Sequence, residues 1–367
     1  MKILLVTGIF PPDIGGPASY VPRIGAELAK RHDVSVFTLG NHEDTHENFP
    51  FKVRRISKIG NASARRVKTV RGIRSAAQYV DVVLANGLFF ETALALRKKV
   101  PSIAKVVGDT VWERARNRGD TEVSLDDFQR DQGLLHLRIF HYLQSLSMRT
   151  YKKIFTPSKY LRDVVEKWGV SGHRLSVIPN AVEPSASFNQ SPEVDLVCVS
   201  RLVPWKGVFE LVRLAVSNNW SLLLIGDGPL RSDLETFLKN EPNNKVEIRG
   251  VVPREQVTRE IQRGRIFILN SSYEGLPHVV LEAQAAGVPV VATRAGGTPE
   301  CVQNGLTGCL VEVGDIDQLR ETISSLLGDP LRRDKLVDAA LNGIRTRFSF
   351  QQMIAKTEML LTEAAGH

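Results

Sequence analysis

Short runs of aliphatic and β-branched residues alternate with longer stretches of helical periodicity along the chain of 367 residues. In the first half, apolar runs bounded by Gly, Pro, Asn or Asp predict buried parallel strands at 2–7, 34–39, 81–85, 103–107, 154–156 and 175–178. Helical patterns lie between them, among others at 18–30, 134–149 and 159–168. Alternating strands and helices are typical of a parallel sheet with right-handed crossovers.

The same pattern starts again after the polar segment 183–192 (EPSASFNQSP). Its strands are predicted at 195–200, 221–225, 246–249, 266–269, 288–292 and 309–312, and its helices include 208–216, 279–286 and 318–327. We therefore predict an α/β protein with two doubly wound parallel-sheet domains, 1–182 and 193–348, joined by a linker at 183–192. Ligands of such sheets bind beyond the carboxyl ends of the strands, so we expect the site in a cleft between the domains.

Composition narrows the class of protein. A hydrophobic fraction of 43% excludes wholesale disorder. The three cysteines form no C-x-x-C pair, which argues against a disulfide framework or a cysteine zinc site and fits a reducing compartment. No apolar run approaches the roughly 20 residues that span a bilayer. We therefore expect a cytoplasmic protein.

The net charge of +8 is unevenly distributed. Residues 1–172 hold 28 basic and 17 acidic side chains, whereas residues 173–367 hold 20 and 23. Within 52–74 there are nine basic residues and no acidic one: Lys52, Arg54, Arg55, Lys58, Arg65, Arg66, Lys68, Arg71 and Arg74. This run is either a solvated helix face or a surface that binds an anionic membrane. In the second case we expect the protein to lie at the inner face of the cytoplasmic membrane. It lacks the interleaved aromatic residues of a nucleic-acid surface, so no nucleic acid is expected.

Two candidate motifs directly follow the first predicted strand of each half. Gly15 and Gly16 precede a helix and would let a ligand approach main-chain amides, although an ordinary strand–helix turn is equally compatible. Arg201 and Lys206, separated by a Pro turn and followed by Gly207, can converge on one diphosphate, unless they are two solvated surface charges.

Two further motifs follow later strands of the second half. Pro277 is suited to the first turn of a helix, which places Glu274 in the preceding loop and Glu282 within the helix. Carboxylates at these positions could bind sugar and ribose hydroxyls, although Glu282 could equally be a surface salt-bridge partner. The segment 296–300 (GGTPE) opens a short helix whose amides could bind phosphate or sugar oxygens.

Taken together, these motifs resemble the retaining glycosyltransferases of family 4. The resemblance rests on Arg201 and Lys206-Gly207, the segment 225–229 (IGDGP), Glu274 and Glu282 seven residues further on, and 296–300, in this order. Pro157-Ser158 and the segment 178–180 (IPN) also look like landmarks of that family. The resemblance covers nearly the whole chain and is strongest from about residue 153 to residue 308.

The resemblance implies a GT-B architecture of two Rossmann-like domains, with a nucleotide-sugar donor held mainly by the second. It also implies that the last helix, about 350–364 within the segment 349–367, crosses back to the first domain. By this likeness Arg201 and Lys206 bind the donor diphosphate, Glu282 the ribose and Glu274 the donor sugar. The loops that contain Gly15 and Gly16, and Gly275, Leu276, Pro277 and His278, complete the donor site.

The resemblance further implies transfer with retention and without a metal or other cofactor. Arg201 and Lys206 would stabilise the charge of the departing nucleoside diphosphate. Many relatives carry a histidine after the strand at 103–107, but this chain has Asp109 and Glu113 in that segment. Asp109 or Glu113 is therefore a candidate to contact the donor sugar or act on the acceptor hydroxyl, although Asp109 could equally only cap the loop.

Two apparent metal motifs are set aside. The H-E-x-x-H match at 42–46 lies in a polar loop, whereas a zinc site requires it on a helix. The D-x-D match at Asp315 precedes a helical pattern, where Asp is an ordinary N-cap.

The predicted partners are a nucleotide-sugar donor and a glycan or lipid-linked acceptor, as in cell-envelope or polysaccharide synthesis. The alternatives are a nucleotide-sugar 2-epimerase of the same fold and a basic nucleic-acid-binding protein. Nothing in the sequence identifies the base, the sugar or the acceptor.

Overall fold

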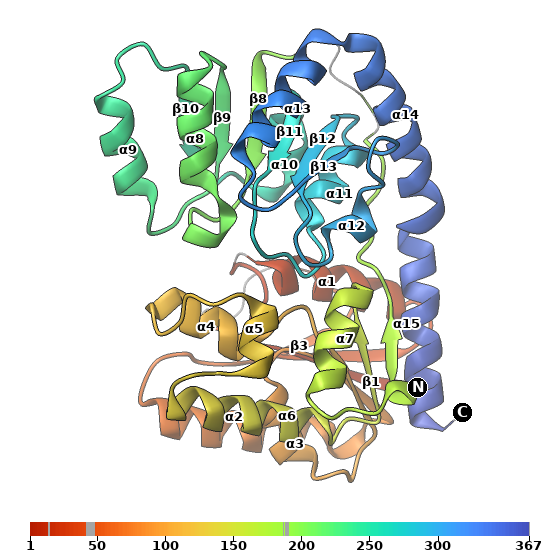
Figure 1. The fold of residues 1–367 in the computed structure, drawn as a ribbon. Coiled ribbons are helices and arrows are strands. Elements are labelled where there is room, and N and C mark those ends of the chain that lie inside the picture. Colours follow the sequence, from red (N-terminus) through yellow and green to blue (C-terminus); the bar gives the residue numbers. More distant parts are fainter. Residues whose placement is uncertain (14, 42–47, 186, 188–190, 367) are drawn as a thin grey trace. The chain divides into compact units, whose positions relative to one another are not determined.

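The computed structural model describes residues 1–13, 15–41, 48–185, 187 and 191–366, and it contains two compact units (Figure 1). The first unit consists of Met1–Ile178 and Gln351–His367, and the second of Pro179–Phe350. Both ends of the chain therefore belong to the same unit. These bounds differ slightly from the ranges 1–182, 193–348 and 349–367 that the sequence suggested.

The first unit is built on a seven-stranded sheet in the order β3-β2-β1-β4-β5-β6-β7, and each neighbouring pair is parallel. Its strands are β1 (Lys2–Thr7), β2 (Asp33–Leu39), β3 (Lys52–Ile56), β4 (Val82–Asn86), β5 (Ser102–Lys105), β6 (Lys153–Thr156) and β7 (Leu175–Val177). Its helices are α1 (Gly16–Leu28), α2 (Ala62–Ala76), α3 (Phe89–Leu96), α4 (Thr110–Arg118), α5 (Leu125–Arg130), α6 (Leu135–Met148), α7 (Lys159–Lys167) and α15 (Phe350–Ala365), with short 3₁₀ turns at Ala77–Tyr79 and Gly172–Arg174.

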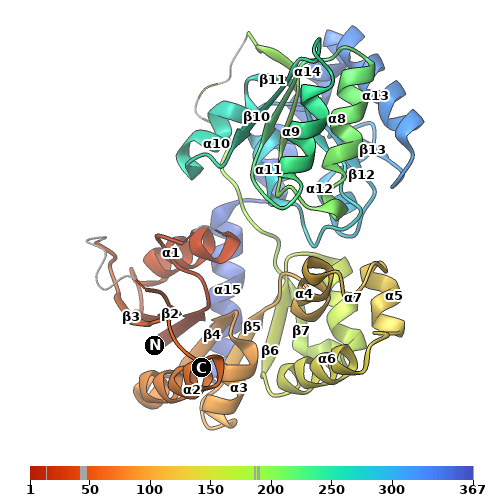
Figure 2. The ribbon, with the colours of Figure 1, turned by 90° about the vertical axis from the view of Figure 1, so that its left-hand side faces the viewer.

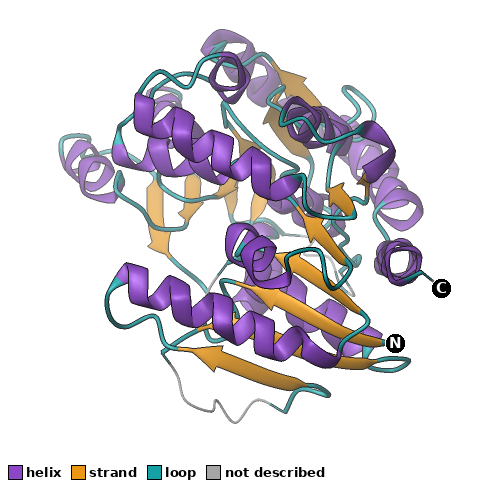
Figure 3. Cartoon of the chain, turned by 90° about the horizontal axis from the view of Figure 1, so that it is seen from below, coloured by secondary structure: helices purple, strands orange, loops and turns teal. Residues whose placement is uncertain are grey.

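Helices cover both faces of this sheet (Figures 2 and 3). The crossover through α1 leads from β1 to β2, whereas those through α2, α3 and α6 lead in the opposite direction along the sheet. Right-handed crossovers therefore place α1 on one face and α2, α3 and α6 on the other. On that second face α3 packs between α2 and α6.

The C-terminal helix α15 is fixed to the first unit by ion pairs and hydrogen bonds. Arg31 and His32, which follow α1, both contact the Glu358 carboxylate, at 2.6 and 2.7 Å. Hydrogen bonds from Arg31, countered in part by burial, lower the pKa of Glu358. At the other end of α15, Lys152 donates to the Ala364 carbonyl at 2.8 Å and Lys153 pairs with Glu363 at 2.6 Å. These contacts explain why the last helix belongs with the N-terminal part of the chain.

The second unit has a six-stranded parallel sheet in the order β10-β9-β8-β11-β12-β13. Its strands are β8 (Val194–Val199), β9 (Leu222–Ile225), β10 (Val246–Gly250), β11 (Gly264–Leu269), β12 (Val290–Thr293) and β13 (Cys309–Val311). Its helices are α8 (Val208–Ser217), α9 (Arg231–Lys239), α10 (Arg254–Ile261), α11 (His278–Ala285), α12 (Thr298–Cys301), α13 (Ile316–Gly328) and α14 (Pro330–Arg347), with a 3₁₀ turn at Pro204–Lys206. The prediction of two doubly wound parallel sheets is confirmed.

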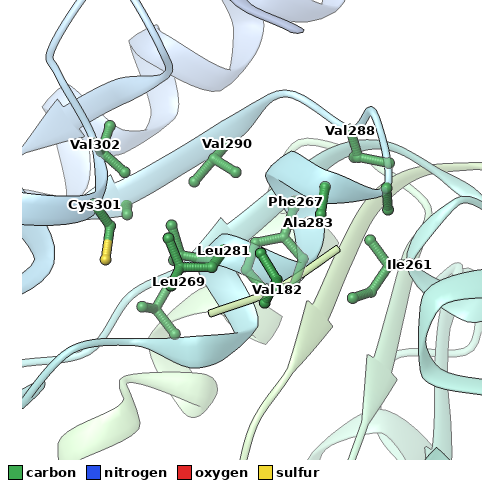
Figure 4. Close-up of a cluster of buried hydrophobic side chains, with 14 of the residues drawn as sticks. Val182, Ile261, Phe267, Leu269, Leu281, Ala283, Val288, Val290, Cys301 and Val302 are labelled. Carbon is green, nitrogen blue, oxygen red and sulfur yellow. The ribbon is translucent and has the colours of Figure 1, made fainter. Parts of the chain in front are cut away.

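Successive residues of the second sheet point to opposite faces, and each face has its own hydrophobic cluster. Phe267 and Leu269 of β11 pack with Leu281 of α11 on one face, shown in Figure 4. Ile266 and Ile268 pack with α8 and α13 on the other. Because both faces are covered, the strands are apolar throughout, which is why they were visible as short apolar runs.

Several details differ from the sequence prediction. The basic run 52–74 contains an edge strand, β3, which was not predicted, and most of α2, where a solvated helix face was one of the two alternatives. β3 (KVRRI) is short and charged and therefore lacks the apolar run of a central strand. Pro277 precedes α11 and does not lie in its first turn. Asp315 is confirmed as the N-cap of α13, since it accepts a hydrogen bond from the Gln318 amide. The match at 42–46 lies outside the described residues.

Candidate active site

Four loops of the second unit follow neighbouring strands at the carboxyl edge of its sheet. They follow β9, β8, β11 and β12 and contain the segments 226–230, 200–207, 270–277 and 294–298. Parallel strands that neighbour one another end on the same edge, so the topology brings the four sequence motifs of this unit together. Direct contacts between the loops confirm this arrangement.

Main-chain hydrogen bonds connect the loop after β8 with the loop after β11. The Ser272 amide donates to the Trp205 carbonyl at 2.8 Å, and the Asn270 side-chain amide donates to the Gly207 carbonyl at 3.0 Å. Gly207 has φ +58°, and a Cβ at this position would lie 2.2 Å from the Asn270 carbonyl oxygen. Only glycine therefore allows the two loops to approach this closely.

The closest contact of the site is an ion pair between these two loops. The Lys206 ammonium lies 2.5 Å from a carboxylate oxygen of Glu274, and their side chains are only 15% and 10% exposed. The Glu274 carbonyl in turn accepts a hydrogen bond from the Gly297 amide at 2.9 Å, which connects the segment 296–300 to the pair. Because both charges are largely removed from water, the loss of either partner would leave the other uncompensated.

Arg201 lies at the start of the same loop and is exposed. Its guanidinium lies over the buried Trp205 ring, 5.6 Å from the centroid, and forms no ion pair with a side chain in the described part of the chain. Stacking orients the guanidinium while leaving its N–H groups available. Beneath the loop, burial raises the pKa of the Cys198 thiol to about 11, so this cysteine is an inert packing residue.

Glu282 lies on α11 and has two basic neighbours. Nη2 of Arg254 approaches its carboxylate at 2.6 Å and Nδ1 of His278 at 3.0 Å. Burial on its own would raise the pKa of Glu282, but the hydrogen bonds and charges of His278 and Arg254 outweigh it and lower the pKa. Glu282 is thus held ionised beside the loop that contains Glu274.

Arg254 is a site residue that the sequence did not reveal. It is the first residue of α10 and lies 28 positions before its partner Glu282. No Gly-rich loop precedes α10 and Arg254 matches no sequence motif. Only the three-dimensional structure therefore shows that it contacts Glu282. Leu276, by contrast, belongs to the hydrophobic cluster of this unit, which leaves only its backbone for a ligand.

In the first unit, Asp109 is completely buried and caps helix α4. One of its oxygens accepts hydrogen bonds from the amides of Val111 and Trp112 and from the Gln144 side chain, and the other accepts one from Gln129. Both oxygens are therefore occupied by protein donors. This geometry favours the capping alternative over contact with a substrate.

Gly15 and Gly16 lie where α1 begins, directly after the β1 loop. Gly16 is exposed, and a Cβ there would meet nothing within 4 Å. The amides at this helix N-terminus are therefore accessible to an anion. The glycines belong to the first unit, whereas Lys206, Glu274 and Glu282 belong to the second.

Two family models match successive parts of the chain. Residues 14–186 match the model described as Glycosyltransferase Family 4, and residues 183–342 match Glycosyl transferases group 1. The matched regions together cover both units, and the second contains the four loops of the site. The chain belongs to glycosyltransferase family 4.

This glycosyltransferase resembles curated and structurally solved proteins over its whole length. It is 26% identical, over 96% of its own chain and 95% of the other, to the GDP-mannose-dependent monoacylated α-(1-6)-phosphatidylinositol monomannoside mannosyltransferase of Corynebacterium glutamicum. The structure of Anabaena HepE with UDP and glucose matches it with a TM-score of 0.78 and 19% identity, covering 99% and 100% of the two chains. Sucrose-phosphate synthase from Thermosynechococcus elongatus gives a TM-score of 0.81 at 20% identity, covering 99% and 98%. The predicted GT-B fold is confirmed.

Within the described ranges, the glycosyltransferase contains no group of three or more His, Cys, Asp or Glu side chains that could hold a metal ion. None of the helices in the same ranges is long and apolar enough to cross a membrane.

Proposed function

We propose that this glycosyltransferase moves a sugar, with retention at the anomeric carbon, from a nucleoside-diphosphate sugar to a hydroxyl group of a glycan or lipid-linked glycan. The observation that carries the proposal is the Lys206–Glu274 ion pair beside the exposed Arg201 guanidinium. The pair places a fixed cation and a carboxylate at the edge where a donor of this fold binds. Arg201 adds a second cation in the same loop.

The residue roles follow from charge and geometry. Lys206 and Arg201 bind the diphosphate and stabilise the negative charge that grows on it as the bond from the anomeric carbon to the phosphate oxygen breaks. Glu274 and the backbone of residues 275–277 hold hydroxyls of the donor sugar, and Glu282, with His278, binds the ribose diol. We also propose Gly15 and Gly16 of the first unit as residues that bind phosphate or sugar oxygens.

In this mechanism the acceptor oxygen attacks the same face of the sugar that the diphosphate leaves. The new bond forms between that oxygen and the anomeric carbon, and the acceptor proton passes to the departing phosphate oxygen. The two basic side chains compensate the charge of the leaving group, so we expect no metal or other cofactor.

The names of relatives guide the choice of substrates for the test. The Corynebacterium relative is named for GDP-mannose and a phosphatidylinositol monomannoside, and HepE was crystallised with UDP. We therefore propose an acceptor of the glycan or glycolipid class and assay UDP- and GDP-sugars with phosphatidylinositol mannoside and oligosaccharide acceptors in EDTA. Formation of an α-linked product from an α-linked donor supports the proposal. Inversion, or isomerisation of the donor without an acceptor as in an epimerase, contradicts it.

Glu282 gives a test of donor binding that includes its pH dependence. We expect Glu282→Gln to weaken nucleoside-diphosphate binding by roughly 10- to 100-fold, because a charged hydrogen-bond acceptor is lost. Because the folded-state pKa of Glu282 is lowered, its contribution is complete at neutral pH and is lost only as the pH falls through that lowered value. Calorimetric titration from pH 4 to pH 8 measures both effects.

Glu235→Gln is the matched control, since Glu235 pairs with Arg231 on the exposed helix α9 of the same unit. Equal affinities of wild type and Glu282→Gln, or an acid limb of binding already at pH 6, would contradict the assignment.

We also propose that the run 52–74 faces the anionic inner surface of the cytoplasmic membrane. Lys68 and Arg71 of α2 are exposed and form no ion pair within the described ranges. With about 1 kcal/mol per basic side chain, we expect Lys68→Gln/Arg71→Gln to weaken binding to phosphatidylglycerol vesicles roughly 25-fold at low salt. Co-sedimentation measures this, and unchanged binding by the variant would contradict the proposal.

A further inference from the structure

A second basic feature of the first unit contains no residue of the run 52–74. A cavity of about 610 Å³ lies where strands β5, β6 and β7 begin. It is therefore at the amino-terminal edge of the first sheet, opposite to the edge where these strands end. It is lined by Lys98, Lys99, Val100, Pro101, Ser102, Arg149, Thr150, Tyr151, Lys152, Lys153, His173 and Arg174. Six of these side chains are lysine or arginine, and no carboxylate lines the cavity.

Several of the cations are held in position without being neutralised. Nζ of Lys152 donates to the Ala364 carbonyl at 2.8 Å, and Nε of Arg149 donates to the Trp168 carbonyl at 3.1 Å. A carbonyl oxygen orients such a group but carries no full charge to cancel it. Lys153 is the exception, because it pairs with the half-exposed Glu363 at 2.6 Å.

Part of the positive charge has a structural purpose, but not all of it. Arg174 donates to the carbonyls of Arg149 and Tyr151 and so satisfies the C-terminal end of α6. Lys98 and Lys99 follow the end of α3 and are exposed, and their side chains form no hydrogen bond or ion pair with any described residue. These two lysines and Lys152 are therefore available to an anion in the cavity.

An apolar stripe on α6 leads to the same cavity. Leu135, Ile139, Tyr142 and Leu146 are 73%, 50%, 61% and 46% exposed. Their spacing of four, three and four residues places them on one side of the helix, and Arg149 continues the series three residues later. With a rise of about 1.5 Å per residue, the stripe extends about 21 Å from Leu135 to the cavity wall.

A strongly basic cavity of about 610 Å³ at the end of an exposed apolar stripe matches the chemistry of an anionic lipid. We propose that the cavity binds the phosphate headgroup of an anionic phospholipid whose acyl chains contact the apolar stripe of α6. The helices α2 and α6 lie on the same face of the sheet, with α3 between them. The headgroup site thus adds a specific lipid contact to the general charge attraction of the run 52–74, although it does not depend on it.

The test uses dihexanoyl phosphatidylglycerol below its micelle concentration, so that a single lipid is bound and no membrane surface is present. We expect saturable calorimetric binding to wild type and to Lys68→Gln/Arg71→Gln. Binding should weaken roughly 25-fold in Lys98→Asn/Lys99→Gln, at about fivefold per lysine. Asparagine suits Lys98 because the residue has φ +61°.

Two further arms separate the lipid from a soluble phosphate. Leu146→Ser should weaken binding of the lipid but not of glycerol 3-phosphate, and glycerol 3-phosphate should bind wild type more weakly than the lipid does. The absence of saturable lipid binding, equal binding by the double lysine variant, or glycerol 3-phosphate binding as tight as the lipid would each overturn the proposal. The assay contains no sugar donor, so its outcome is separate from that of the transferase activity.

Discussion

Lys206→Ala is expected to lower kcat/KM at least about 1,000-fold, while the enzyme remains folded. The substitution removes a cation that we assign to the donor diphosphate, and it also leaves the Glu274 carboxylate, only 10% exposed, without its partner at 2.5 Å. The effect should therefore appear in kcat as well as in KM, because the lost charge stabilises the departing diphosphate more than the bound donor.

Lys245→Ala is the matched control for this substitution. Lys245 belongs to the same unit, and among the described residues its ammonium donates a hydrogen bond only to the Asn219 carbonyl, at 3.5 Å. Its replacement should leave the activity unchanged. Initial rates with circular dichroism on the same samples measure both variants, and a loss of less than tenfold for Lys206→Ala would contradict the assigned role.

Gly207→Ala is expected to lower the free energy of unfolding of the second unit by about 3 kcal/mol. A non-glycine residue at φ +58° costs about 1–2 kcal/mol, and the forced separation of two packed loops costs about 1–3 kcal/mol more. The added Cβ would lie 2.2 Å from the Asn270 carbonyl oxygen, which is main chain and cannot rotate away. Because Lys206 precedes this glycine, activity should fall as well.

Gly305→Ala separates the two costs. Gly305 also has a left-handed conformation, with φ +75°, but a Cβ there would meet nothing within 4 Å. We expect it to cost about 1–2 kcal/mol from the backbone alone. Urea unfolding of both variants makes the comparison, and equal losses would show that the contact with Asn270 does not hold the loop.

The architecture could be predicted because it depends on local pattern. Strands buried on both faces are continuous apolar runs, so most of β1, β8 and β11 were found, and the parallel topology then put their following loops on one edge. β3 was not predicted because an edge strand needs no continuous apolar run. The Asp315 cap was predictable for the same local reason, since its partner is the amide three residues later.

The candidate site was only partly accessible from sequence. The positions of Lys206, Glu274 and Glu282 after predicted strands identified them as candidates. Those positions did not predict the contacts that these side chains make. The ion pair joins residues 68 positions apart, and Arg254 reaches Glu282 from a helix with no motif. Asp109 shows that a polar residue at a promising position can have a structural role instead. It is buried and accepts four hydrogen bonds that the sequence did not reveal.

The central claim is that the second unit holds the diphosphate of a nucleotide-sugar donor through Lys206. Calorimetric titration of UDP, GDP and ADP into wild type, Lys206→Ala and Lys245→Ala tests it most directly. We predict that at least one nucleoside diphosphate binds wild type and Lys245→Ala equally, and that Lys206→Ala binds it at least about 100-fold more weakly. Binding of that nucleotide to Lys206→Ala with unchanged affinity, or no binding of any of the three to wild type, would contradict the account.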